Sequence, residues 1–364
     1  MHIINQDLID RFIEFIHNIK PNDKIAIFYD NDPDGVCSGV LLYKALKNLL
    51  GCEPVIFECA PHDETSYYDE IIVRLKRKNV NKIFILDLVV ESRHEVMKKL
   101  EEFAELVIID HHPLEKNISS DRTIFIKPEL YVIGINPTRY CTTKQVFDLL
   151  SHVIDISKYE WLAVMGIIGD YAYDSWQDFM EHCFRKYDVK EEPDIYQTMF
   201  GKATRYLNYV RTIDNKEVKE VAEYLLKIED FGTAFSILER YKKIEDEINK
   251  FIDGYEKFSE EYPEKDLLIV HVQTAYKINS SVATQLSRKR FPRKVVITYF
   301  FTDGHVWVSA RRQDGKADMG KLLRKCIEGF EEANAGGHVP AAGCSILKED
   351  WPEFKKRLIE NTGK

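Results

Sequence analysis

The stretch IAIFYDNDPDGVCSGVL, residues 25–41, decides the fold. An apolar run leads into three aspartates at alternate positions, Asp30, Asp32 and Asp34, and then into a helix-like segment. The pattern predicts a buried strand, a turn and a helix. Three carboxylates this close repel one another unless a cation lies among them, and all-oxygen ligands suit Mg²⁺ or Mn²⁺. The alternative is a solvated acidic turn in which an aspartate caps the helix.

The composition is that of an ordinary globular protein with room for two domains. The chain has 364 residues, of which 45% are hydrophobic and 30% are charged. No apolar run reaches the length of a membrane span, and the first residues do not resemble a secretion signal. The seven cysteines include no C-x-x-C pair. This spacing argues against a zinc ribbon or a disulfide framework, and we expect a reducing, cytoplasmic location.

The net charge of −9 hides a difference between the two ends of the chain. Residues 265–364 contain 18 Lys and Arg against 11 Asp and Glu, a balance of +7, so the rest of the chain carries −16. An acidic first part that holds cations and a basic last part that holds anions suit an enzyme that acts on phosphoesters. A difference in charge between two domains also arises by chance.

Apolar strands alternate with helical segments through the first half of the chain, which predicts a mostly parallel sheet covered by helices on both faces. The expected segments, in chain order, are a helix over 5–19, the strand at 25–29, a helix over 36–50, a strand over 53–58, a helix over 66–78, a strand over 82–87, a helix over 91–104 and a strand over 106–110. A further strand and turn are expected within 124–138.

Acidic and imidazole groups fall at the ends of three of these strands. The three aspartates follow the first, Asp87 ends another, and Asp110, His111 and His112 follow a third. In parallel sheets the ligand crevice lies at the carboxyl ends of the strands. We therefore expect a metal site at this edge of the sheet.

A helix capped by Thr142 or Thr143 should run to about residue 153, and an apolar helix over 161–169 ends on Asp170. An acid at the end of an apolar helix is costly unless it meets solvent or a cation. A solvent-facing helix end and a metal ligand are equally good interpretations of this stretch alone.

The region from 176 to about 261 is charged and helical in rhythm without a strand pattern, and 236–258 reads as one long helix. We interpret it as a connector between domains. A second strand-rich part follows, with strands expected over 266–272, 294–301 and 305–310, the last two joined as a hairpin, and helices from 280 and over 318–329.

A glycine-rich segment, AGGHVPAAG at 335–343, lies near the end of the chain. Paired glycines let backbone N–H groups approach an anion, and His338 with Arg311 or Arg312 would add charged donors. A tight turn without a ligand is the alternative.

Together these residues resemble the DHH phosphoesterase family over most of the chain. The D-x-D-x-D-G at 30–35 resembles the first motif, Asp87 the second, Asp110-His111-His112 the third and Gly169-Asp170 the fourth. Residues 265–347, with S-x-R at 309–311 and G-G-H-x-x-A-A-G at 336–343, resemble the DHH-associated C-terminal domain. The resemblance implies an α/β protein with a parallel-sheet catalytic domain over 1–175, a helical connector over 176–262 and a smaller α/β substrate domain over 263–364. The active site is expected in the cleft between the two α/β domains.

The resemblance also implies two Mn²⁺ or Mg²⁺ ions, which supply a nucleophile at neutral pH and neutralise charge on the phosphorus. Asp32 would ligate one ion, Asp87 would bridge both, and the other ion would take Asp34, His111 and Asp170. The Asp110-His111-His112 motif would be catalytic, with His112 acting near the leaving oxygen. Ser309, Arg311, Arg312, Gly336, Gly337 and His338 would bind substrate. Many relatives carry a histidine where this chain has Phe28, and Asp30 is the expected substitute ligand.

Three functions are compatible with these residues. The first, which we favour, is a RecJ-like exonuclease on single-stranded DNA or RNA, with Tyr299, Phe300 and Trp307 as stacking candidates that equally suit a strand core. The second is a phosphodiesterase for short oligonucleotides, cyclic dinucleotides or a nucleotide bisphosphate. The third is a replisome scaffold with weak or no catalysis. Replication or repair proteins are further expected partners, and a membrane is not.

Overall fold

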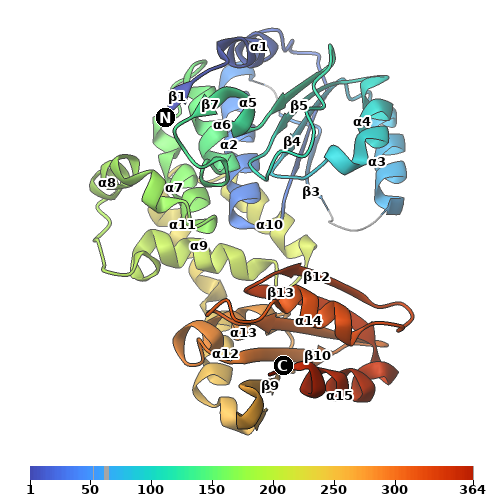
Figure 1. Ribbon diagram of the computed structural model, residues 1–364. Helices are drawn as coiled ribbons and strands as arrows, with labels where there is room; N and C mark the ends of the chain where they lie inside the picture. The colour runs from blue at the N-terminus through green and yellow to red at the C-terminus, as the bar shows by residue number, and fades with distance from the viewer. Residues whose placement is uncertain (52, 61–64, 364) are drawn as a thin grey trace. The chain divides into compact units, whose positions relative to one another are not determined.

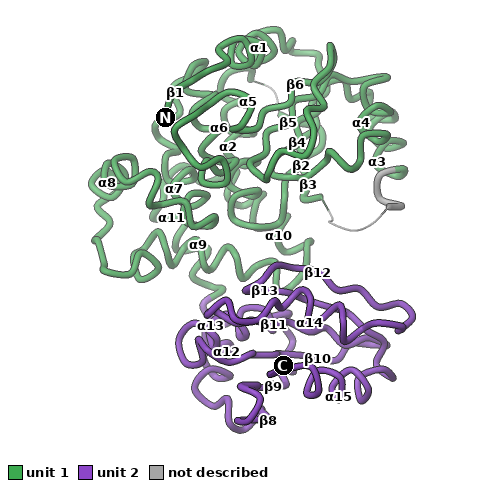
Figure 2. Tube along the Cα trace, viewed as in Figure 1, with its two compact units in different colours: residues 1–241 green, residues 242–364 purple. Residues whose placement is uncertain are grey.

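The computed structural model describes residues 1–51, 53–60 and 65–363. The chain divides into two compact units, Met1–Tyr241 and Lys242–Lys364, shown in green and purple in Figure 2. Within the described residues, each helix is too short or too polar to cross a bilayer. Six cysteines are buried free thiols, and the seventh, Cys52, lies outside the described residues.

The first unit is built on a five-stranded sheet in the order β3-β2-β4-β5-β6, in which all neighbouring strands are parallel (Figure 1). This confirms the α/β class and the parallel sheet. A short antiparallel pair, β1 with β7, lies apart from it. The strands are β1 His2–Ile3, β2 Ile25–Tyr29, β3 Ile56–Cys59, β4 Lys82–Leu86, β5 Glu105–Ile109, β6 Thr123–Ile126 and β7 Val132–Ile133.

Helices cover both faces of this sheet, as the alternating pattern predicts. On one face, side chains of α3 and α4 share a core with Phe28 of β2 and Ile85 of β4. On the other face α2 packs so closely on β2 that a Cβ at Gly39 would lie 2.9 Å from the ring of Tyr29. The helices are α1 Gln6–His17, α2 Pro33–Leu50, α3 Thr65–Arg77, α4 His94–Glu101, α5 Pro128–Tyr131, α6 Thr142–Ser151 and α7 Glu160–Gly169.

Four more helices complete the first unit: α8 Gln177–Lys186, α9 Met199–Val210, α10 Asn215–Leu225 and α11 Phe231–Leu238. Aromatic packing joins α8, α9 and α11: the ring of Phe200 lies 5.5 Å from that of Phe184 and stacks on that of Phe231 with the centroids 4.1 Å apart. The expected single helix over 236–258 is wrong. The chain forms a 3-10 turn at Glu239–Tyr241, where the Tyr241 hydroxyl bonds to Glu217, and α12 (Lys242–Asp253) begins the second unit.

The second unit holds a six-stranded sheet in the order β12-β13-β11-β10-β9-β8. Only β9 and β10 are parallel, and β10 and β11 form the expected hairpin. The expectation that the region to 261 has no strand is wrong, because β8 pairs with β9 there. The elements are β8 Ser259–Tyr262, β9 Leu267–His271, α13 Asn279–Lys289, β10 Val295–Phe301, β11 His305–Arg311, α14 Met319–Cys326, β12 Asn334–His338, β13 Ala341–Leu347 and α15 Trp351–Asn361.

The glycine-rich segment contributes two paired strands, so the tight turn at Gly336–His338 that was left open as an alternative does not form. Gly336 and Gly337 lie in β12, the edge strand, opposite Gly343 and Ala342 of β13. Gly337 has φ +135°, and a Cβ there would lie 2.5 Å from the Ala341 carbonyl oxygen, so close pairing of the two strands requires this glycine.

Candidate metal centre

The carboxyl ends of three adjacent strands carry the predicted acidic residues. Asp30 follows β2, Asp87 follows β4 and Asp110 follows β5. The sheet order places β4 between β2 and β5, so the three residues lie in sequence along one edge. The structure therefore brings together groups that are up to 80 positions apart in the sequence.

Asp34 is fixed by the start of α6. Its Oδ2 accepts a hydrogen bond from the Thr142 N–H at 2.6 Å, and its Oδ1 accepts one from the Thr143 N–H at 2.8 Å. The Thr143 hydroxyl donates to the backbone oxygen of Asp34 at 2.8 Å. The expected capping role of these threonines is wrong, because the residue at the N-cap is Cys141. The N-terminal N–H groups of α6 instead orient a buried carboxylate from another helix.

Asp87 has a left-handed backbone, with φ +61°, and its side chain is buried. Its Oδ1 accepts a hydrogen bond from the Thr142 hydroxyl at 2.9 Å. A non-glycine residue in this conformation is uncommon, and such residues concentrate at functional sites. The conformation and the bond together fix the direction of this carboxylate.

His111 links the centre to the end of α7. Its Nε2 lies 2.7 Å from Oδ2 of Asp170 and 3.5 Å from Oδ1 of Asp87. Its Nδ1 lies 3.1 Å from the Thr138 carbonyl oxygen, which accepts a hydrogen bond if Nδ1 carries the proton. That arrangement leaves Nε2 for a metal, as is usual for histidine ligands. Without a metal, burial alone would lower the pKa of His111, but hydrogen bonding to Asp170 raises it to about 9.

Asp110 is fully buried and orients its neighbours. Its Oδ1 lies 2.7 Å from Nδ1 of His112, and its Oδ2 lies 2.9 Å from Nζ of Lys127. Lys127 is itself buried and pairs with Glu91 at 2.5 Å. Burial alone would raise the pKa of Asp110, but hydrogen bonding from His112 and the charges of His112 and Lys127 lower it to about 2. Asp110 is therefore an anion that holds His112, whose side chain is 42% exposed.

Among the residues that the structure describes, potential ligand atoms converge in three groups, each with its atoms within 4.8 Å of one another. Asp87 belongs to two of the groups and His111 to two. The groups are Asp30 with Asp32 and Asp87, Asp34 with His111 and Asp170, and Asp87 with His111 and His112. All the predicted metal ligands are thus brought together, and Asp110 belongs to none of the groups.

The chemistry of these groups fits a hard divalent ion. Burial, together with the charges of Asp30 and Asp170, raises the pKa of Asp32. Burial and Asp170 also raise the pKa of Asp34, to about 7, and burial with the neighbouring aspartates raises that of Asp87 far above its ordinary value. Burial and mutual repulsion thus disfavour the charged form of these carboxylates, and a bound cation would relieve that cost. Carboxylate oxygens with one imidazole are ligands that suit Mn²⁺ or Mg²⁺.

Phe28 lies outside the centre. It is a buried core residue that packs with Ile56 and Ile85 on the face of the sheet covered by α3 and α4. Asp30, two positions further along the chain, has a carboxylate oxygen within 4.8 Å of ligand atoms of Asp32 and Asp87. The three-carboxylate group therefore forms without a histidine at position 28.

Three supporting groups were not predicted from the sequence. They are the N–H groups of Thr142 and Thr143, the carbonyl of Thr138 and the ammonium of Lys127. Each acts across a separation of at least 15 residues, and backbone groups leave no sequence signal. Of these groups, only Lys127 leaves a signal in the sequence. It is a charged residue directly after the apolar strand β6, and such a position indicates a buried side chain with an acidic partner.

The predicted substrate-binding residues all lie in the second unit. Ser309 and Arg311 are on one face of β11, and Arg311 is held by the hydroxyls of Thr284 at 3.0 Å and Ser280 at 2.8 Å. Arg312 is buried and pairs with Asp314 at 2.7 Å. Of the rest, Gly336 and His338 are on the exposed edge strand β12 with Gly337 between them.

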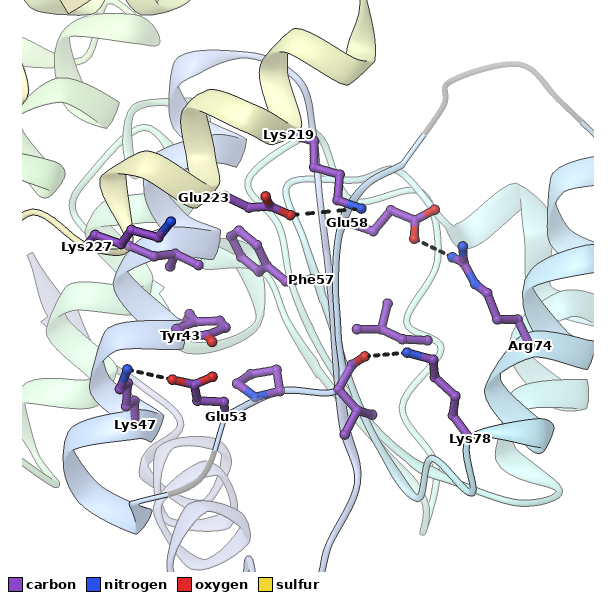
Figure 3. Close-up of a pocket in the computed structure, with 14 residues that line it drawn as sticks. Tyr43, Lys47, Glu53, Phe57, Glu58, Arg74, Lys78, Lys219, Glu223 and Lys227 are labelled. Carbon is purple, nitrogen blue, oxygen red and sulfur yellow. Dashed lines mark hydrogen bonds and ion pairs between the residues drawn. The ribbon is translucent and has the colours of Figure 1, made fainter. Parts of the chain in front are cut away.

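A separate pocket of about 510 Å³ lies along β3 in the first unit (Figure 3). Its charged side chains largely pair with one another, as Lys47 does with Glu53 at 2.5 Å and Arg74 does with Glu58. Lys78 donates to the Val55 carbonyl at 2.9 Å. None of its lining residues belongs to the three ligand groups.

Comparisons with known proteins agree with the fold. The sequence matches the model of the DHH family N-terminal domain over residues 24–169 and that of the DHHA1 domain over residues 266–364. A search of curated proteins found no match.

Three solved structures illustrate the likeness. One, described as the DHH domain of a member of the s1p family of ribosomal proteins, has a TM-score of 0.72 at 14% identity and covers 99% of this chain and 91% of its own. The structure of exonuclease RecJ bound to manganese has a TM-score of 0.67 at 15% identity, and the match covers 97% of this chain and 93% of the RecJ chain. The structure of CDC45 from Entamoeba histolytica has a TM-score of 0.58 at 12% identity, and the match covers 96% of this chain and 98% of the CDC45 chain. At these identities the likeness shows the fold.

Proposed function

Because the chain belongs to the DHH family, we propose that it is a metal-dependent phosphodiesterase that removes nucleotides from an end of single-stranded DNA or RNA. The observation that carries the proposal is the position of Asp87, which shares one ligand group with Asp30 and Asp32 and another with His111. A shared carboxylate is the arrangement needed for two ions on one phosphate.

In this proposal Asp30 and Asp32 hold one Mn²⁺ or Mg²⁺, Asp34, His111 and Asp170 hold a second, and Asp87 serves both. Bound ions of this kind supply a nucleophilic water at neutral pH and neutralise charge that develops on the phosphate. Asp110 is a positioning residue that keeps His112 oriented by the 2.7 Å contact. The raised pKa of His112, which Asp110 causes, suits a donor of the proton that the leaving oxygen requires.

The second unit and the solved structures that share the fold support a nucleic-acid substrate. The basic balance of +7 over residues 265–364 and the exposed His338 favour a polyanion. The exonuclease RecJ shares the fold over nearly the whole chain. CDC45 shares the fold too, but the presence of all the acidic ligands here favours catalysis over a scaffold role.

The test is digestion of end-labelled single strands of DNA and RNA, from three to about forty nucleotides, with Mn²⁺ and with EDTA. We expect progressive shortening from one end that requires the metal. Cleavage of the shortest strands alone would replace the proposal with an oligonucleotide-recycling function, and cleavage that persists in an Asp87→Asn variant would remove the proposed site. Asp174→Asn, an exposed acid outside the ligand groups, is the matched control.

A further inference from the structure

The end of helix α7 places an exposed tyrosine directly after one of the proposed metal ligands. Asp170, a member of one ligand group, is the C-cap of this helix, and Tyr171 follows it. Tyr171 is 47% exposed, although large aromatic side chains are usually mostly buried. Because consecutive Cα atoms are only about 3.8 Å apart, a tyrosine at this position can reach a molecule that is bound at Asp170.

The backbone of Tyr171 has a conformation that tyrosine rarely adopts. Its φ is +55°, in the left-handed region. The N–H of Tyr171 donates to the Ile168 carbonyl at 3.2 Å. The next N–H, that of Ala172, donates to the Ile167 carbonyl at 2.9 Å. These two bonds define the Schellman ending of a helix, whose left-handed position is usually glycine because a side chain there is strained.

Two other helices of the first unit end with the same pair of backbone hydrogen bonds, but with better-suited residues. Asn79 closes α3 with φ +54°, and Asp188 closes α8 with φ +50°. Asparagine and aspartate tolerate this conformation because their short polar side chains can bond locally. Among the described non-glycine residues with a positive φ, Tyr171 is the only aromatic one. The end of α7 therefore gives up stability to keep this ring, and strained residues of this kind concentrate at functional sites.

One short segment fixes both Tyr171 and the metal ligand His111. The guanidinium of Arg139 donates a hydrogen bond to the Tyr171 carbonyl oxygen. The carbonyl oxygen of the preceding residue, Thr138, lies 3.1 Å from Nδ1 of His111. The indole N–H of Trp176 donates to the Arg139 carbonyl at 2.8 Å and so holds the segment in place. The backbone of Tyr171 is thus positioned by the same segment that orients a proposed metal ligand.

The ring of Tyr171 belongs to a cluster of three tyrosines. Its centroid lies 6.0 Å from that of Tyr196, which meets the ring of Tyr173 edge-on at 6.5 Å. The Tyr196 hydroxyl donates to the Ile168 carbonyl at 3.3 Å. Tyr173 and Tyr196 are half-buried, so they support the more exposed ring of Tyr171.

We propose that Tyr171 is a substrate-binding residue, whose ring stacks on the base of the nucleotide whose phosphate lies at the metal centre. The inference rests on the proposed function and adds to it a base contact in the first unit. Stacking on an aromatic ring accepts any base, because every base has a π-face, so the contact suits a strand of mixed sequence. The left-handed backbone then has a reason, since it keeps a rigid aromatic side chain next to a metal ligand.

The test compares two esters that release the same p-nitrophenolate with Mn²⁺, namely the p-nitrophenyl ester of thymidine 5′-monophosphate and methyl p-nitrophenyl phosphate. Only the first carries a base, and we expect the wild type to prefer it in kcat/KM. Tyr171→Gly should lower this preference by about 5- to 150-fold, whereas Tyr171→Phe should keep most of it. The ratio cancels any disturbance of Asp170, because both esters meet the same metal centre.

Thermal unfolding of the same preparations distinguishes this role from a structural one. Glycine relieves the left-handed strain, so Tyr171→Gly should melt no lower than the wild type while it loses the preference. Asp188→Gly, the matched control, changes the same position of another helix end outside the ligand groups and should keep the preference. An unchanged preference in Tyr171→Gly, or a melting temperature clearly below that of the wild type, would overturn the proposal.

Binding measurements separate this proposal from the proposed function. Calorimetric titration of the chain in Mn²⁺ with thymidine 5′-monophosphate and with inorganic phosphate requires no hydrolysis. We expect the wild type to bind the nucleotide more tightly than phosphate, and Tyr171→Gly to lose this difference. A chain that hydrolyses neither ester yet shows this result would contradict the proposed function and support the base contact. Equal affinities of the wild type for the two ligands would overturn the base contact.

Discussion

The two units present their functional groups in opposite ways. In the first, carboxylates follow parallel strands and are buried beside one another, and burial together with the neighbouring carboxylates raises the pKa values of Asp34 and Asp87. In the second, Arg311 and Trp307 lie on the antiparallel strand β11, and the hydroxyl oxygens of Ser280 and Thr284 in α13 hold the arginine. Closely spaced buried carboxylates favour binding of a metal cation. A guanidinium that is held in place by neutral oxygens instead favours binding of an anion from solution.

We expect the largest effect from a substitution that removes the carboxylate shared by two of the ligand groups, that of Asp87. Asp87→Asn keeps the shape of the side chain and tolerates the left-handed backbone at φ +61°. We expect Mn²⁺-dependent hydrolysis to fall by at least about 10³-fold, in line with the several kcal/mol that such ions contribute. Steady-state kinetics with the wild type and Asp174→Asn measure this change, and activity within tenfold of wild type would contradict the role of Asp87.

Loss of a buried ion pair in the first unit should destabilise the protein more than loss of a partly exposed ion pair in the second. Lys127→Met leaves two buried carboxylates, those of Asp110 and Glu91, without their cation. Urea denaturation should show a loss of about 3–5 kcal/mol in the first unit's transition. Lys355→Met breaks the partly exposed 2.6 Å pair with Glu260 in the second unit and should cost below about 1 kcal/mol. Equal losses would refute the contrast.

Alanine substitutions of two adjacent glycines test the pairing of β12 with β13 in the second unit. Gly337→Ala places a methyl group against the Ala341 carbonyl oxygen at a positive φ, and we expect a loss of about 1–3 kcal/mol. Gly336→Ala adds its methyl group to open space and should change stability by under about 0.5 kcal/mol. Thermal unfolding of both variants measures the difference, and equal stabilities would show that β12 does not pair as described.

The smallest effect concerns Asp314, whose pKa is lowered to about 2, first by the hydrogen bond from Arg312. A carboxyl whose folded pKa is depressed stabilises the fold above its ordinary pKa, and this contribution disappears as the pH falls through the folded value. Asp314→Asn should therefore lower the melting temperature of the second unit at pH 7 only slightly, by less than about 2 °C, because solvent screens this pair. The difference should vanish near pH 2, and a difference that is constant with pH would contradict the assignment.

Local patterns were enough to predict the strands of the first unit's parallel sheet and the acidic motifs, whereas β8 and β12 of the second unit were missed. The alternation around residues 25–110 predicts the parallel sheet, and the rule that ligands gather at strand ends predicts that Asp30, Asp87 and His111 converge. The break of the expected long helix at Glu239–Tyr241 was missed, because it depends on the contact of Tyr241 with the distant Glu217.

The finer geometry of the site depends on contacts that a sequence does not display. The Thr142 and Thr143 N–H groups reach Asp34 across 108 and 109 positions, and the Thr142 hydroxyl reaches Asp87 across 55. A tight turn stayed open as the alternative for the paired glycines, because glycine permits both a turn and a close strand pair. Only the register of β12 with β13 distinguishes the two.

The most direct test of the central claim, that Asp87 joins two ion sites, is electron paramagnetic resonance of the wild-type chain titrated with Mn²⁺. Our account predicts two bound ions per chain and the multi-line spectrum of a spin-coupled pair, which Asp87→Asn should abolish. A single uncoupled ion at saturation, or coupling that survives in Asp87→Asn, would contradict it.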